Sequence, residues 1–378
     1  MAAFIIKEDF IMAEYNRKAS RVIDNHTHVW DWFEDGKPFY ERFDEYRKCN
    51  QLDYVNVTCV PYINHPILKR DVSQNIMGAI LKLKDPHFFA HGGLFYLNKP
   101  VQKPIQDTFR PEVQLQELMD IGFDGMKMLE TKPTTYKMLK LPPNDPVYDA
   151  YYTILEANHI PVIWHVNDPD FFWNCKEKMS PSHIQSGWWY GDGSFTSNTQ
   201  VYEEIYDVLR RFPKLCITFA HMLFLTPHPD QILHLLRTYP NVTFDLTPNP
   251  YLYQDITKDY DLWRQIFIDY PDRFLLGTDR GSRHKPASTI PYVSDLIRFI
   301  ESSDHYNGFG HPEEIHGLNL DPDTADSILY RNFLRIAGDT PRPIQIDALM
   351  DYIDKYLPFI AEGDTKEQIK HFRHTGRI

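Results

Sequence analysis

Cysteine is scarce in this chain of 378 residues, which has only four, and none of them belongs to a C-x-x-C pair. A disulfide-stapled fold needs more cysteines than this in a chain of such length, so that class is excluded. Cys59 and Cys216 fall within apolar runs. We therefore expect both to be buried thiols that pack as small apolar side chains.

Long apolar runs and basic runs are missing as well. No stretch approaches the roughly 18 apolar residues that a membrane span requires. Charged side chains interrupt the first 20 residues, so this segment lacks the apolar stretch of a signal peptide. The net charge of -12 disfavours a nucleic-acid partner, because the phosphate backbone would be repelled. We expect a cytoplasmic protein that acts on a small molecule and binds neither membranes nor nucleic acid.

The sequence does contain eight short apolar runs that are bounded by turn or breaker residues, and each is predicted to be a buried strand. Helical patterns fill the gaps between them, which predicts an α/β protein with a closed (β/α)8 barrel. No G-x-G-x-x-G or P-loop follows any run, which disfavours a doubly wound open sheet. The predicted strands are 22–28, 55–60, 88–96, 125–129, 161–166, 215–221, 242–246 and 274–279.

One helix is predicted in detail. Apolar residues recur from Val201 to Phe212 at the spacing of a helix face, and Pro213 ends the pattern. Asn198 or Thr199 is the expected N-cap. Glu203 and Glu204 are expected on the solvent side of this helix.

We predict a single domain over residues 1–378, with the barrel core at about 22–338 and a helical tail at 339–378. The segment from Asn167 to Asn198 follows the fifth strand and is too long for a plain connection. It contains several aromatic residues, including Trp188. Loops on this side of a barrel form the active site, so an aromatic lid is one interpretation. An outer hairpin that only shields the barrel is the other.

The strongest chemical signal is the pair His26 and His28. Residues two apart in a strand point to the same side, about 6.6 Å apart along the strand. Two imidazoles at the carboxyl end of a barrel strand can therefore hold one metal ion. His165, His221 and Asp279 also end predicted strands. A single histidine in such a place is more often a hydrogen-bonded core residue, but five such groups at strand ends predict a metal site.

In this combination, the chain resembles the amidohydrolase superfamily. It is most similar to the branch that includes aminocarboxymuconate semialdehyde decarboxylase, benzoate-type decarboxylases and lactone hydrolases. The resemblance runs from about Val22 to Gly338. It includes the motif at 122–127, before the fifth strand, and the closing helix at 328–335.

The resemblance implies a role for each of the five residues. His26, His28 and His165 would bind one divalent metal through imidazole nitrogens, and Asp279 would add a carboxylate oxygen. Three nitrogens and one oxygen suit Zn²⁺, with Mn²⁺ or Fe²⁺ as alternatives. Asp279 would accept a proton from water and donate it later. His221 would polarise the substrate or move a proton, or else act as a fifth ligand.

Other charged residues have open interpretations. Lys127 would carry a carbamate that bridges two metals, contact an anionic substrate, or form a structural ion pair. Arg280 and Arg283 would bind a substrate carboxylate or make surface salt bridges. Asp245 would orient a ligand or cap a turn, and Asp24 would bond to a neighbour.

The expected function is metal-dependent hydrolysis of a small organic acid, amide, ester or lactone, with an anionic substrate. Non-oxidative decarboxylation of a small aromatic or unsaturated acid is the alternative reaction, because the same residues support it. A non-catalytic barrel scaffold is the alternative from another class. Relatives with this fold are often dimers, so a homodimer is the oligomer that the resemblance implies.

Overall fold

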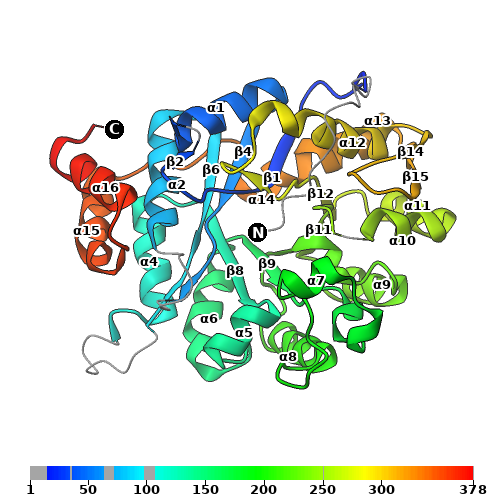
Figure 1. Ribbon diagram of the computed structural model, residues 1–378, viewed down its shortest axis with the longest axis horizontal. Helices are drawn as coiled ribbons and strands as arrows, with labels where there is room; N and C mark the ends of the chain where they lie inside the picture. Colours follow the sequence, from blue (N-terminus) through cyan, green and yellow to red (C-terminus); the bar gives the residue numbers. More distant parts are fainter. Residues whose placement is uncertain (1–14, 35, 64–71, 98–106, 250, 378) are drawn as a thin grey trace.

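The computed structural model describes residues 15–34, 36–63, 72–97, 107–249 and 251–377, so most of the N-terminal stretch tested for a signal sequence lies outside it. Its main sheet is parallel throughout, with strand order β12-β11-β10-β9-β8-β6-β4-β1-β13 (Figure 1). All eight predicted strands are confirmed. Their bounds are β1 (Ile23–His28), β4 (Tyr54–Thr58), β6 (Phe88–Gly93), β8 (Gly125–Thr131), β9 (Val162–Val166), β10 (Ile217–Phe219), β11 (Val242–Asp245) and β12 (Phe274–Leu275).

The ninth strand, β13 (Arg280–Gly281), continues the eighth and closes the sheet. β12 pairs with β11, whereas β13 pairs with β1. Between them, the Asn25 N–H donates to the Leu276 carbonyl at 3.0 Å, and the Asp279 N–H donates to the His26 carbonyl at 2.8 Å. The segment 274–281 therefore bonds to the first and the seventh strand of the barrel. This confirms the predicted closed barrel.

Helices surround the strands (Figure 1). Their apolar faces pack on the outside of the barrel, because the parallel strands present buried side chains on both faces. The helices are α1 (Phe39–Cys49), α2 (Ser73–Lys84), α4 (Pro111–Ile121), α5 (Pro133–Leu139), α6 (Asp149–Ala157), α7 (Pro181–Gln185), α8 (Asn198–Arg211), α9 (Pro229–Thr238), α10 (Leu252–Lys258), α11 (Tyr260–Asp269), α12 (Ile290–Glu301), α13 (Pro322–Asp326), α14 (Asn332–Ala337), α15 (Ile346–Tyr356) and α16 (Asp364–Thr375).

Within the described residues, three two-stranded sheets lie outside the barrel sheet. They pair β2 (Phe33–Glu34) with β3 (Lys37–Pro38), β5 (Tyr62–Ile63) with β7 (Phe95–Tyr96), and β14 (His305–Asn307) with β15 (Glu314–His316). Among the described residues, none of the helices is long and apolar enough to cross a membrane.

The amino end of the barrel is plugged by apolar side chains. Ile23, Phe89 and Leu275, near the starts of their strands, pack with Phe333 of α14. The rings of Phe89 and Phe333 meet edge to face, with centroids 4.9 Å apart. Because this end is filled, only the carboxyl ends of the strands are left to form a site.

Helix α8 confirms the predicted apolar face but corrects the predicted cap. The Ser197 hydroxyl accepts the N–H of Gln200 at 3.2 Å, so Ser197 is the N-cap instead of Asn198 or Thr199. Asn198 is engaged elsewhere, because its side-chain amide faces the Asp168 carbonyl at 3.4 Å. The prediction for Glu204 is also wrong. This residue is buried and accepts the Tyr136 hydroxyl at 2.8 Å.

The cysteine prediction holds for one of two residues. Cys59 is buried, whereas Cys216 is only partly buried because it lies one residue before β10, where the chain enters the barrel from a turn. The tail packs on the barrel's helices, with α15 against α4 and α2 (Figure 1). The Arg342 N–H donates to the Asp124 carboxylate at 2.7 Å, which fastens the start of the tail.

Asp295 on α12 gives a prediction for stability. Its carboxylate accepts the Phe309 N–H at 3.0 Å. Burial raises the pKa of Asp295 from 3.8 to about 6, although the Phe309 bond and the Arg298 charge oppose the shift. The folded state therefore keeps this proton to a higher pH than the unfolded state. It follows that stability falls as the pH rises from about 4 to about 6, and the loss persists above that.

Asp295→Asn keeps an acceptor for Phe309 without the charge. We expect this variant to exceed wild type in free energy of unfolding by about 3 kcal/mol at pH 8, and by about half of that at pH 5. Urea denaturation at both pH values measures the difference. Asp272→Asn, at an exposed position, is the control. A gain that does not change with pH would contradict the prediction.

Candidate metal centre

The two histidines of β1 meet Asp279 at the carboxyl end of the barrel. The His26 and His28 ring centroids are 5.0 Å apart. His28 Nε2 lies 2.9 Å from Asp279 Oδ1. One side-chain atom from each of these three residues lies within 4.8 Å of the others, a spacing suited to one metal ion. The Asp279 side chain is 43% exposed and faces the open end of the barrel.

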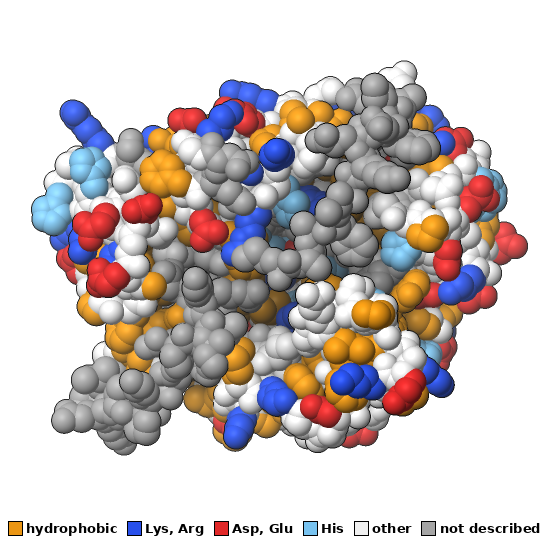
Figure 2. All heavy atoms as spheres, in the orientation of Figure 1, with side chains coloured by type: hydrophobic (Ala, Val, Ile, Leu, Met, Phe, Trp, Pro, Cys, Tyr) orange, Lys and Arg blue, Asp and Glu red, His pale blue; other side chains and the backbone are white. Residues whose placement is uncertain are grey.

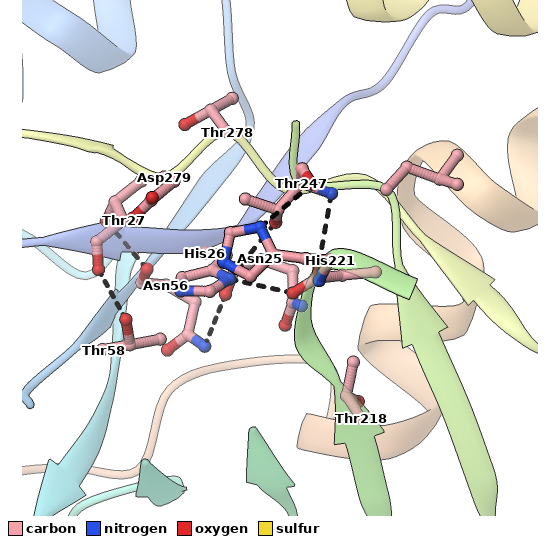
Figure 3. Close-up of polar contacts among 12 residues, drawn as sticks. Asn25, His26, Thr27, Asn56, Thr58, Thr218, His221, Thr247, Thr278 and Asp279 are labelled. Atoms are coloured by element: carbon pink, nitrogen blue, oxygen red, sulfur yellow. Dashed lines mark hydrogen bonds and ion pairs between the residues drawn. The ribbon is translucent and has the colours of Figure 1, made fainter. Parts of the chain in front are cut away.

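Hydrogen bonds fix which nitrogen each imidazole offers. His26 Nδ1 lies 2.9 Å from Asp245 Oδ2, and His28 Nδ1 lies 2.7 Å from the Thr58 carbonyl. His221 Nδ1 faces the Thr247 carbonyl at 3.2 Å (Figure 3). Carbonyl and carboxylate oxygens can only accept, so each Nδ1 carries the proton. All three histidines are therefore left with an Nε2 lone pair, as metal-binding histidines require.

The contact between His28 and Asp279 points to a cation. His28 Nδ1 already holds a proton, and its Nε2 lies 2.9 Å from a carboxylate oxygen, so a second proton or a shared cation must lie between Nε2 and that oxygen. Two acceptors at this distance repel each other unless a proton or a metal ion lies with them. Burial would raise the pKa of Asp279, but its contact with His28 holds that pKa well below its usual range, so the Asp279 carboxylate is ionised and able to bind a cation. The donor set thus fits a divalent metal.

Lys127 of β8 lies inside this group. Its Nζ is 2.9 Å from His26 Nε2, and its side chain is fully buried. Its ammonium therefore bonds a histidine nitrogen. Burial lowers the pKa of Lys127 to about 8, although the charges of Asp245 and Asp279 oppose this. Burial and the Lys127 charge lower the pKa of His26 to about 3, so His26 is neutral at pH 7.

Asp245 joins two of the histidine-bearing elements. Besides His26, its carboxylate accepts the N–H of His221 at 2.8 Å and the N–H of Thr247 at 3.1 Å. Burial would raise the pKa of Asp245, but the charge and hydrogen bond of His26 lower it to about 2. This contact agrees with the interpretation that Asp245 orients a ligand. Asp24 accepts the His26 N–H at 3.1 Å and also bonds Thr278, which fastens β1 to the segment before Asp279.

His221 lies in an unusual stretch of backbone. Residues 221–224 all have φ between 53° and 57°, and Asp279 has φ 55°. Left-handed conformations are costly for residues other than glycine and recur at functional sites. The His221 ring lies 5.7 Å from that of His26 and 4.9 Å from that of His165. The His221 ring therefore lies beside the three-residue group.

His165 is the predicted ligand that stands apart from the three-residue group. Its Nε2 lies 3.0 Å from the Asn167 carbonyl and 3.4 Å from Asp168 Oδ1. With Nε2 protonated toward these acceptors, Nδ1 is its free nitrogen. Burial lowers the pKa of His165 to about 3, and the nearby Lys132 charge adds to this effect.

The other predicted substrate-binding residues, Arg280, Arg283 and Trp188, each contact an aromatic side chain. The Arg280 guanidinium stacks on the Tyr292 ring at 3.5 Å. Arg283 stacks on Trp30 at 4.4 Å and pairs with Asp31 at 3.7 Å, as a surface salt bridge would. The His284 Nδ1 accepts the Gly281 N–H at 3.2 Å. Trp188 is exposed and stacks on Phe172 within the long segment after β9. Figure 2 shows histidine and basic side chains near the centre of the face that is in view.

Sequence reasoning missed several residues around the centre. Lys132 and Asp168 form a salt bridge at 2.6 Å next to His165, and the carbonyls of Thr58 and Thr247 accept from histidines. A backbone acceptor leaves no residue-type signal. Lys132 and Asp168 could have been identified from the sequence, because each is a charged residue that follows a predicted strand within three residues.

Comparison with known proteins gives a family match. Residues 100–336 match the family model described as Amidohydrolase. No curated protein matches the chain significantly.

Solved structures share the fold at low sequence identity. A putative amidohydrolase from Staphylococcus aureus is 13% identical, with TM-score 0.53 over 84% of this chain and 99% of that one. A probable 2-pyrone-4,6-dicarboxylic acid hydrolase from Acinetobacter baumannii is 11% identical, with TM-score 0.51 over 84% and 99%. A dihydroxybenzoic acid decarboxylase from Polaromonas, with bound manganese, is 14% identical, with TM-score 0.50 over 84% and 96%. These likenesses establish the fold and include both reaction types.

Proposed function

This chain belongs to the amidohydrolase family, and from that premise we propose that it is a metal-dependent hydrolase of a small organic acid, amide, ester or lactone. The observation that carries the proposal is the pair of facing acceptors, His28 Nε2 and Asp279 Oδ1, 2.9 Å apart in a group of three potential ligands.

His26, His28, His165 and Asp279 are the proposed ligands of one divalent ion. Imidazole nitrogens with a carboxylate oxygen suit Zn²⁺, and Mn²⁺ or Fe²⁺ are the alternatives. Each of the three histidines has an acceptor on its other ring nitrogen: Asp245 for His26, the Thr58 carbonyl for His28 and the Asn167 carbonyl for His165. Asp24 also accepts the backbone N–H of His26. Lys127 shares the His26 lone pair, so it must release Nε2 to the metal and turn to a neighbouring anion.

The chain's own residues supply the proton transfers. When bound, the ion supplies Lewis acidity that lowers the pKa of water to about 7. Asp279 Oδ accepts the proton of the attacking water and later gives it to the leaving group, since its low pKa keeps it ionised at rest. His221 Nε2 faces the centre with its lone pair, because the Thr247 carbonyl holds the Nδ1 proton. It takes or returns a proton at the substrate's oxygen.

Decarboxylation is the second candidate, and the buried Lys127 ammonium is the observation that favours it. This cation would hold a substrate carboxylate at the centre, while protonated Asp279 or His221 would deliver a proton to carbon. Hydrolysis remains the first choice because the exposed face of Asp279 admits water.

Metal analysis combined with product analysis tests the proposal. We expect about one zinc or manganese per chain, and turnover of lactones or aryl esters that a chelator abolishes. In ¹⁸O-labelled water, the acid product should contain the label. Release of CO2 from carboxylated phenols without label uptake would establish decarboxylation instead. Absence of both activities in the metal-loaded protein would favour the scaffold alternative, and full turnover after complete metal removal would refute the mechanism.

A further inference from the structure

The segment between β9 and α8 folds around a small core of its own. Phe172, Met179 and Tyr190 are buried there, and partly buried aromatic side chains surround them. Tyr190 has an exposed fraction of only 1%. Its hydroxyl nevertheless leaves this core and donates to Asp168 Oδ2 at 2.6 Å. The core of the segment is thus bonded to Asp168, two residues after the end of β9.

Asp168 also binds a lysine from the neighbouring strand end. Lys132 Nζ, just after β8, donates to Asp168 Oδ1 at 2.6 Å, and the Asp168 side chain is 5% exposed. A buried carboxylate with a charged partner and a hydroxyl donor is firmly held, because loss of either donor would leave part of a charge unpaired. Both oxygens of Asp168 are therefore occupied.

Asp168 acts on His165 through Lys132, which lies close to both side chains. Lys132 Nζ lies 3.5 Å from His165 Nε2, so it is close enough to become a donor to that nitrogen. At present Nε2 instead donates to the Asn167 carbonyl at 3.0 Å, with Asp168 Oδ1 at 3.4 Å. Asn167 has φ 63°, a left-handed conformation that aims its carbonyl, and asparagine tolerates it better than most residues.

We propose that Asp168 is a positioning residue that binds the Lys132 ammonium in place of His165 Nε2, and so keeps Nδ1 of His165 free as a metal ligand. Without the Asp168 charge, Lys132 donates to Nε2, the proton moves to Nδ1, and His165 cannot bind a metal through that nitrogen. Tyr190 ties this arrangement to the folding of the segment 167–198. The inference rests on the proposed metal-dependent function for its consequence, but the tautomer itself does not depend on that function.

Nuclear magnetic resonance of ¹⁵N-histidine in the metal-free full chain reads the tautomer directly. The His165 signals are assigned by their absence in His165→Gln. Wild type should show the Nε2–H form, and Asp168→Asn should show the Nδ1–H form. Removing the competing donor in the double variant Asp168→Asn with Lys132→Met should restore the Nε2–H form. A merely structural role of Asp168 predicts no such rescue.

Zinc titration of the same proteins gives the second measurement, with Zn²⁺ alone as the probe. Asp168→Asn should weaken zinc binding by about 10- to 100-fold, the usual effect of losing a partner that orients a ligand. The double variant should regain most of the lost zinc affinity and bind zinc within about threefold of wild type. Tyr190→Phe should weaken binding by about threefold to tenfold. Tyr136→Phe, which removes a similar buried bond to Glu204, is the control and should leave binding unchanged.

The outcomes separate this inference from the proposed function. An Nδ1–H tautomer in wild type, an unchanged tautomer in Asp168→Asn, or no rescue in the double variant overturns the positioning role. Circular dichroism shows whether each variant is folded, and Tyr190→Phe provides the mild change if Asp168→Asn unfolds. Failure of wild type to bind zinc overturns the metal-dependent function, while the tautomer measurements still decide the role of Asp168.

Discussion

Asp279→Ala is expected to lose the bound metal and to lower kcat/KM by at least about 10³-fold. Asp279 is a proposed ligand and also the proposed proton acceptor, so one substitution removes both roles. A catalytic metal contributes several kcal/mol of transition-state stabilisation, and about 4 kcal/mol corresponds to a thousandfold in rate. Its carboxylate is the partner of His28 Nε2 at 2.9 Å, so the cation loses its only oxygen ligand in the group.

Metal content by mass spectrometry and steady-state kinetics measure this result together. Asp272→Ala, seven residues earlier and exposed, is the matched control and should keep the metal and activity. His26→Ala should behave like Asp279→Ala if both bind the same ion. Retention of one metal per chain in Asp279→Ala would place the ion elsewhere and would remove the basis of the ligand assignment.

Lys127→Met is expected to separate substrate turnover from metal binding. Lys127 is buried and shares the His26 Nε2 lone pair at 2.9 Å. Methionine fills a similar volume but does not compete for that lone pair, so zinc affinity should not weaken. If Lys127 contacts an anionic substrate, kcat/KM should fall by about 10²- to 10³-fold, because truncating one partner of a buried charged contact costs several kcal/mol.

Zinc titration and kinetics on an anionic substrate measure the two effects side by side. Lys137→Met, at an exposed position on α5, is the control. A drop from two metals to one per chain would establish Lys127 as a bridging carbamate. Unchanged kinetics with a less stable protein would leave Lys127 as a structural residue, contrary to the expected contact with substrate.

The barrel could be predicted because its signal is local. Each strand is a short apolar run that ends at a breaker, and alternation with helical patterns limits the topology. The division of the eighth strand into β12 and β13 could not be predicted from the sequence, because it depends on contacts between segments far apart in the chain, such as the bond between residues 25 and 276. The Ser197 cap was missed because Asn198, an equally good capping residue, is drawn to Asp168 by tertiary contacts.

The sequence predicted the residue types of the candidate site better than it predicted their contacts. His26, His28 and Asp279 come together as the strand-end argument requires. Arg283 was a plausible substrate residue by its position, but it lies over Trp30 beside Asp31. A long side chain after a strand can turn toward the centre or away from it, and only its neighbours decide which.

By itself, the sequence determined the α/β class, the eight strands and the placement of five metal-capable side chains at the carboxyl ends of strands. Strand periodicity and breaker residues act over a few neighbours, so a short stretch of sequence is enough to predict these features. Only the tertiary structure decided which nitrogen each histidine offers, that Lys127 shares the His26 lone pair, and that Asp168 stands between Lys132 and His165. Those features depend on acceptors from other strands, and a proton's position on an imidazole follows from the partner that lies opposite it.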